Sequence, residues 1–120
     1  QEEMVAANVR GQMALADSPW LRTFLVYDPL PMLARVTCPV LALFGANDLQ
    51  VPPSMNVPPL EALAREPGRD LRVRVLPRTN HLFQEADSGS PGLYAVLPKQ
   101  FAPGVLDTIG TWIEEKTRRK

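Results

Sequence analysis

Two short apolar segments, separated by a helical pattern, dominate the middle of the chain. Residues Val36 to Phe44 (VTCPVLALF) are almost entirely apolar and Gly45 closes the run, which is typical of a parallel strand covered on both faces. Leu71 to Leu76 (LRVRVL) alternates apolar residues with two arginines, which predicts a strand near a sheet edge with one partly solvated face. Between them, Pro58 to Glu66 has apolar residues at helical spacing before a Pro-Gly pair, which predicts a crossover helix. The three segments form a βαβ unit with both strands pointing the same way.

Helical patterns also precede this unit. Glu2 to Ala16 is helix-prone but weakly patterned. Asp17 or Ser18, followed by proline, predicts the cap and first turn of a second helix with an apolar stripe. Asp28 then predicts the cap of a short helical turn that extends to Ala34.

A loop and a helix are expected after the unit. Gln84 to Ala102 contains turn residues and no clear period, which indicates a surface loop with a helical turn around Leu93 to Leu97. Pro103 predicts the start of a last helix with an apolar face. The apolar residues of that face are Val105, Leu106, Ile109, Trp112 and Ile113.

Composition narrows the classes of function. Thirteen basic residues balance thirteen acidic ones. The net charge is therefore zero and does not attract nucleic acid or an anionic membrane. No apolar run approaches the roughly 18 residues of a membrane span. With one cysteine, Cys38, and one histidine, the chain has too few soft ligands for a zinc site. We therefore expect no metal site.

Two residues with catalytic potential follow the predicted strands. Asp48 comes a few residues after the first strand, and His81 a few residues after the second. Loops at the carboxyl ends of parallel strands converge over one crevice. Since neighbouring strands lie roughly 5 Å apart, two such loops can bring a carboxylate within hydrogen-bonding distance of an imidazole. Asp48 would then orient His81, and His81 would act as a general base.

Each of these residues, taken alone, also fits a structural role. Asp48 lies in a Gly-Ala-Asn-Asp turn, where aspartate often serves only the turn. A single histidine in a loop is often merely exposed or structural. Glu85 and Asp87 are close to His81 in sequence and are alternative acids. The joint position of Asp48 and His81, each after one of two parallel strands, favours these two residues as the pair.

Several sequence segments resemble those of α/β-hydrolases. FGANDLQVP, with Gly45 and Asp48, is similar to the G-x-x-D-x-x-V-P segment that carries the acid of the family's catalytic triad. Asn80-His81-Leu82-Phe83 resembles the family's histidine loop, and the segment from Val105 its closing helix. A narrower resemblance, to bacterial esterases close to dienelactone hydrolases and prolyl-oligopeptidase-type peptidases, rests on Ser18-Pro19-Trp20, Tyr27-Asp28-Pro29 and Cys38-Pro39-Val40.

The resemblance implies an α/β fold in which this chain is the C-terminal portion of a mostly parallel, doubly wound sheet. Residues 1–120 would supply the last two strands with their flanking helices. The family's nucleophile elbow, G-x-S-x-G, is absent from the sequence, and its serine precedes the acid and the histidine in chain order. Ser90 is flanked by glycines at the wrong spacing, and Ser54 and Ser18 have no elbow. We therefore expect the nucleophile in an N-terminal remainder of the same domain.

The implied function is that of a serine esterase acting on a small-molecule carboxylic ester, with Asp48 and His81 as catalytic residues. This function requires no cofactor. A prolyl-oligopeptidase-type serine peptidase and a noncatalytic binding module on the same scaffold are the alternatives. We also expect Cys38 to be inert core, and Trp20, Phe24 and Tyr27 to pack in a helix core or to line a substrate pocket.

Overall fold

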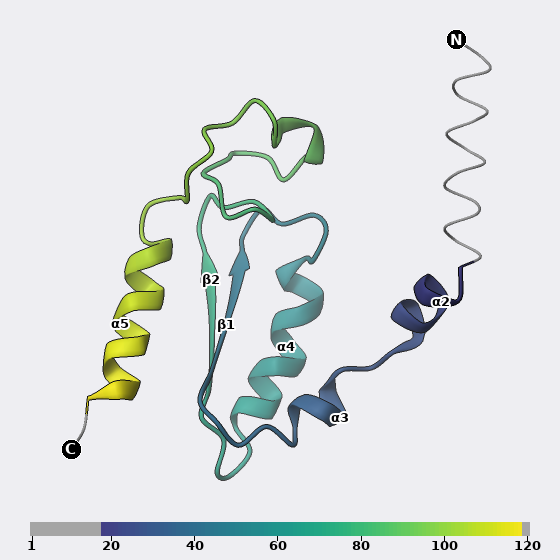
Figure 1. Cartoon of the computed structure of the whole chain (residues 1–120), viewed down its shortest axis with the longest axis vertical. Coiled ribbons are helices and arrows are strands. Elements are labelled where there is room, and N and C mark those ends of the chain that lie inside the picture. Colours follow the sequence, from purple (N-terminus) through teal and green to yellow (C-terminus); the bar gives the residue numbers. More distant parts are fainter. Residues whose placement is uncertain (1–17, 119–120) are drawn as a thin grey trace. The chain divides into compact units, whose positions relative to one another are not determined.

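The computed structural model describes residues 18–118 (Figure 1). They belong to two units, the first ending at Leu33 and the second beginning at Ala34. The predicted helix from Glu2 to Ala16 lies outside the described residues. Among the described residues, none of the helices has the length and apolar character that a membrane crossing requires.

The first unit contains two short helices, α2 (Pro19–Val26) and α3 (Leu30–Leu33). Oγ of Ser18 accepts a hydrogen bond from the backbone N–H of Leu21 at 3.2 Å, so Ser18 is the N-cap of α2. Oδ1 of Asp28 accepts from the N–H of Leu30 at 3.0 Å and caps α3 in the same way. Both predicted caps are confirmed.

Two aromatic side chains of α2 stack on the surface of the helix. The ring centroids of Trp20 and Phe24 are 5.6 Å apart, and each residue is 65% exposed. Tyr27, which follows the helix, is 56% exposed. The predicted packing of these three side chains in a helix core is therefore wrong for the described structure.

The second unit is a mixed α/β structure built on a parallel sheet of two strands, β1 (Val40–Gly45) and β2 (Leu71–Leu76). The strands pair in register from Val40 opposite Leu71 to Gly45 opposite Leu76. Both strands therefore end at the same edge of the sheet. The predicted strand–helix–strand unit is confirmed, and it places the two candidate catalytic loops side by side.

The first strand begins later than its apolar sequence predicts. Val36 to Pro39 lies outside β1, and the first ladder contact is the N–H of Val40, which donates to the carbonyl of Asp70 at 2.8 Å. Pro39 has no N–H to donate, so the strand cannot extend through it in this way. Cys38 is exposed, and its predicted place in the core is wrong.

The crossover helix α4 (Pro53–Ala64) begins five residues before the predicted start at Pro58. Proline usually marks the first turn of a helix, but here Pro58 lies inside the helix, next to a second proline. The first turn has its own anchor, because the backbone N–H and the side-chain amide of Asn56 both donate to the carbonyl of Pro52, at 3.3 and 2.9 Å. The helix packs against β2.

The last helix α5 (Val105–Thr117) starts two residues after Pro103, and Gly104 with φ 83° forms its N-cap. Val105 is 2% exposed, whereas Leu106 and Ile113 of the predicted apolar face are 60% and 47% exposed. Figure 1 shows α4 and α5 on opposite sides of the two strands. Ion pairs tie α5 to the sheet: Arg72 to Glu115 and Asp70 to Lys116, both at 2.6 Å. Before α5, the 3₁₀ turn η1 (Pro91–Leu93) leads into the predicted helical turn, in which the N–H groups of Val96 and Leu97 both donate to the carbonyl of Leu93 at 3.0 Å.

Candidate active site

The loop that follows β1 fixes the carboxylate of Asp48. The N–H of Asp48 donates to the carbonyl of Gly45 at 3.1 Å. Its Oδ1 accepts two hydrogen bonds of 2.8 Å, from the backbone N–H groups of Gln50 and Val51. Asp48 is 7% exposed. One carboxylate oxygen thus holds the local turn, which leaves Oδ2 for a partner from elsewhere in the chain.

The loop that follows β2 carries His81 at its tip. Thr79 and Glu85 form an isolated antiparallel bridge, which closes the loop on itself. The N–H of Asn47, in the aspartate loop, donates to the carbonyl of Thr79 at 2.9 Å. A backbone contact therefore joins the two loops directly.

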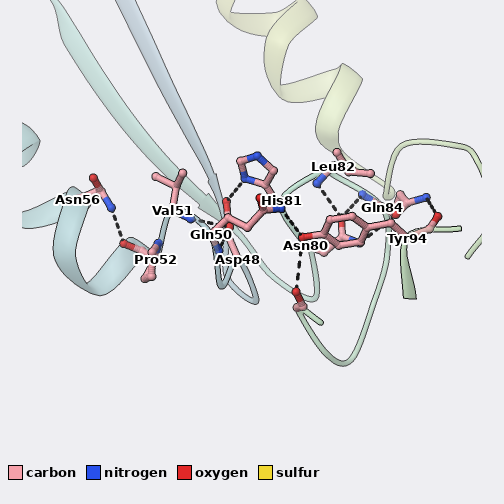
Figure 2. A network of polar contacts seen from close by, with 11 residues as sticks. Asp48, Gln50, Val51, Pro52, Asn56, Asn80, His81, Leu82, Gln84 and Tyr94 are labelled. Carbon is pink, nitrogen blue, oxygen red and sulfur yellow. Dashed lines mark hydrogen bonds and ion pairs between the residues drawn. The ribbon is translucent and has the colours of Figure 1, made fainter. Parts of the chain in front are cut away.

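The structure brings the two candidate residues together. Nδ1 of His81 lies 2.9 Å from Oδ2 of Asp48. The side chain of His81 remains 36% exposed while that of Asp48 is 7% exposed. Figure 2 shows the imidazole next to the carboxylate, with its second nitrogen at the edge of the ring turned away from Asp48. The pair thus joins a buried acid to an accessible ring.

The protonation state of Asp48 decides the direction of this hydrogen bond. Burial acts to raise the pKa of Asp48, but the hydrogen bonds from Val51, His81 and Gln50 outweigh it and hold the pKa below its ordinary value of 3.8. At neutral pH the carboxylate is therefore ionised and can only accept. It follows that Nδ1 of His81 donates the proton, which leaves Nε2 of a neutral ring as an acceptor.

The ring has no second protein partner among residues 18–118. Its Nε2 makes no hydrogen bond with a described residue. An accessible acceptor nitrogen, whose opposite nitrogen is held by a buried carboxylate, is the arrangement that takes a proton from a nucleophile in acyl transfer. The geometry therefore suits a general base.

The other acids near His81 in sequence are engaged elsewhere. Glu85 and Asp87 both pair with Arg78, at 3.5 and 3.1 Å. Asp70 pairs with Lys116, at the opposite end of β2. Among the carboxylates of the described residues, the one hydrogen-bonded to His81 is Asp48.

In the described part of the second unit, neither Ser54 nor Ser90 is hydrogen-bonded to His81. Ser18 caps α2, and Ser54 lies in the first turn of α4. Ser90 precedes η1, and its N–H donates to the hydroxyl of Ser88 at 3.3 Å. The residues 18–118 also hold no group of three or more His, Cys, Asp and Glu side chains that could bind a metal ion.

Part of the chain is similar to a plant enzyme. The chain is similar to acylamino-acid-releasing enzyme 2 of Oryza sativa subsp. japonica. The two are 34% identical over 80 residues, which cover 64% of this chain and 10% of the plant enzyme. The chain thus spans about a tenth of the length of that relative. No family model and no solved structure matches the chain. The similarity supports a hydrolase-like origin for this region and does not distinguish an esterase from a peptidase.

Sequence analysis missed the residues that hold the two loops. Gly89, considered only as a turn residue, is buried, and a Cβ atom there would collide with the carbonyl of Asn47. The amide Nδ2 of Asn47 donates to the carbonyl of Ala86 at 2.8 Å. Asn80 and Gln84 are buried polar residues beside His81. For Gly89, Asn47 and Asn80, the one signal in the sequence was the residue type, since asparagine and glycine favour tight turns.

Proposed function

We propose that the protein containing this chain is a serine hydrolase in which Asp48 and His81 are the acid and the base, and that it cleaves carboxylic esters. The observation that carries the proposal is the 2.9 Å contact between Oδ2 of buried Asp48 and Nδ1 of accessible His81. The similarity to a plant hydrolase supports the same class of reaction. The serine and the oxyanion hole would come from a segment outside these 120 residues.

The proposed reaction uses both nitrogens of His81. Nε2 takes the proton of the serine hydroxyl while the serine oxygen attacks the ester carbonyl. The resulting imidazolium donates from Nδ1 to the Asp48 carboxylate, whose negative charge stabilises it. The same proton then goes from Nε2 to the leaving alkoxide, and an acyl-enzyme forms. His81 then takes a proton from a water molecule whose oxygen attacks the acyl carbon, and it returns this proton to the serine oxygen as the acyl–serine bond breaks and the carboxylic acid leaves.

A second candidate is a peptidase, with which the similarity to an acylamino-acid-releasing enzyme is equally compatible. The acid and base would have the same roles, and the leaving group would be an amine. The two candidates therefore differ in the substrate pocket and not in the chemistry of Asp48 and His81.

Substrate assays and serine labelling of the whole protein distinguish these proposals. We expect purified protein to release 4-nitrophenol from short-chain 4-nitrophenyl esters, and a serine-directed fluorophosphonate to stop the reaction and label one serine. Efficient cleavage of an N-acetyl-aminoacyl 4-nitroanilide, with poor ester turnover, would favour the peptidase. Absence of labelling and of turnover on both substrates would contradict a hydrolase and support a noncatalytic binding module.

A further inference from the structure

The turn that presents His81 is wrapped around the side chain of Asn80. Oδ1 of Asn80 accepts from the N–H groups of Leu82 and Gln84, at 3.0 and 2.9 Å. Its carbonyl accepts from the N–H of Phe83 at 3.0 Å, and its own N–H donates to the carbonyl of Gln84 at 3.1 Å. Three consecutive N–H groups after His81 therefore point to one residue, and Asn80 is 0% exposed.

Gln84 completes this arrangement and connects it to the next loop. It is 6% exposed, and its Oε1 accepts from Nδ2 of Asn80 at 3.0 Å. Its Nε2 donates to the carbonyls of Tyr94 and Pro98, both at 3.3 Å. Figure 2 shows this network on the side of His81 away from Val51. The turn is thus anchored at a point outside itself.

The backbone of the turn would not hold this shape without such support. Phe83 has φ 57°, in the left-handed region that residues other than glycine rarely adopt. Its carbonyl accepts from the N–H of Ala102 at 2.7 Å. Conformations of this kind persist only where surrounding contacts over-determine them.

We propose that Asn80 and Gln84 form a buried amide pair that positions the His81 ring toward Asp48, and that both act as positioning residues for the proposed hydrolase. The catalytic consequence of this inference rests on the proposed function, whereas the orientation of the His81 ring is independent of it. Each amide satisfies the other in a buried site, so removal of one leaves polar groups of its partner unsatisfied. The turn would then relax, and the ring would lose its single orientation.

The test follows the ring nitrogens of His81 in the whole protein, where the loss of signals in His81→Ala assigns them. With histidine labelled with ¹⁵N, the ring nitrogen shifts report one tautomer, in which Nδ1 carries the proton. Asn80→Ala and Gln84→Met should move these shifts toward the mixture found in an exposed histidine, as should the reference variant Asp48→Asn. Asn80→Ser keeps an oxygen acceptor for the turn and should restore part of the wild-type spectrum. Gln100→Met, an equal change at an exposed position, should leave the spectrum unchanged.

Circular dichroism establishes which variants fold. If Asn80→Ala does not fold, the ring shifts of Gln84→Met test the proposal, because this variant leaves the hydrogen bonds of Asn80 to the backbone in place. Wild-type ring shifts in every folded variant of Asn80 and Gln84 would overturn the proposal. So would ring shifts that change equally in Gln100→Met.

Kinetics of the whole protein give the second measurement. A displaced base should lower kcat on the order of 10²-fold while KM changes little. A lower kcat in Gln84→Met with unchanged ring shifts would contradict positioning. If the wild-type protein has no hydrolase activity, the proposed function fails, and the ring shifts still decide the role of the amide pair.

Discussion

Gly45, at the end of β1, lies directly against the backbone of Asn80. A Cβ atom at position 45 would be 2.6 Å from the Asn80 carbonyl oxygen and would also collide with the carbonyl of Thr79. The two loops that carry Asp48 and His81 can approach each other because residue 45 has no side chain. The distance between the candidate acid and base thus depends on a glycine outside the pair.

Gly45→Ala should push the loops apart. We expect the free energy of unfolding to fall by about 1–3 kcal/mol, the usual range for overpacking, and hydrolysis by the whole protein to fall with it. Gly110→Ala is the control: it lies inside α5 with no atom within 4 Å of the added Cβ, so it should gain about 0.5–1 kcal/mol. Urea denaturation measures both changes, and equal stability of Gly45→Ala and wild type would contradict the close approach.

The lowered pKa of Asp48 makes the fold sensitive to acid. Since the pKa of the folded state lies below 3.8, the carboxylate contributes stability that is fully present well above pH 3.8. This contribution is lost as the pH falls through 3.8 and the lower folded pKa. Asp48→Asn should remove it, so the difference in unfolding free energy between wild type and variant should shrink as the pH falls through that window. Denaturation at several pH values, with exposed Asp107→Asn as control, tests this; a difference that does not change with pH would contradict the shift.

Asp48 and His81 should act as one unit in the whole protein. His81→Ala removes the proton acceptor, and we expect kcat to fall by several orders of magnitude with little change in KM. Asp48→Asn presents an amide that cannot stabilise the imidazolium, and a loss on the order of 10⁴ is expected from serine proteases. The double variant should lose scarcely more than the worse single variant. Losses that multiply, or a nearly wild-type Asp48→Asn beside an inactive Glu85→Gln, would assign the acid to another residue.

The isolated 120-residue chain should not hydrolyse activated aryl esters above a protein blank. It supplies a proposed acid and base, but its sequence holds no nucleophile elbow. A burst of 4-nitrophenol that a serine-directed phosphonate abolishes would show that a serine of this chain is the nucleophile. His81→Ala is the matched control for such a burst.

The order of elements followed from local sequence patterns, because apolar runs, capping residues and breakers act over a few positions. The two strands and the caps at Ser18 and Asp28 are examples. The boundaries at Pro39 and Pro58 were wrong, since proline has several local meanings. At Pro39 the missing N–H limits the strand, whereas at Pro58 an earlier turn had already started the helix.

Sequence alone placed Asp48 and His81 after neighbouring parallel strands, because the carboxyl ends of such strands share one edge. Only the tertiary structure joined them at 2.9 Å and separated them from Glu85, which pairs with Arg78. The tertiary structure also placed Gly45 against the backbone of Asn80 and buried the side chain of Asn80. A buried amide or a missing side chain has its effect through the atoms that fold around it, and those atoms come from segments far apart in the sequence.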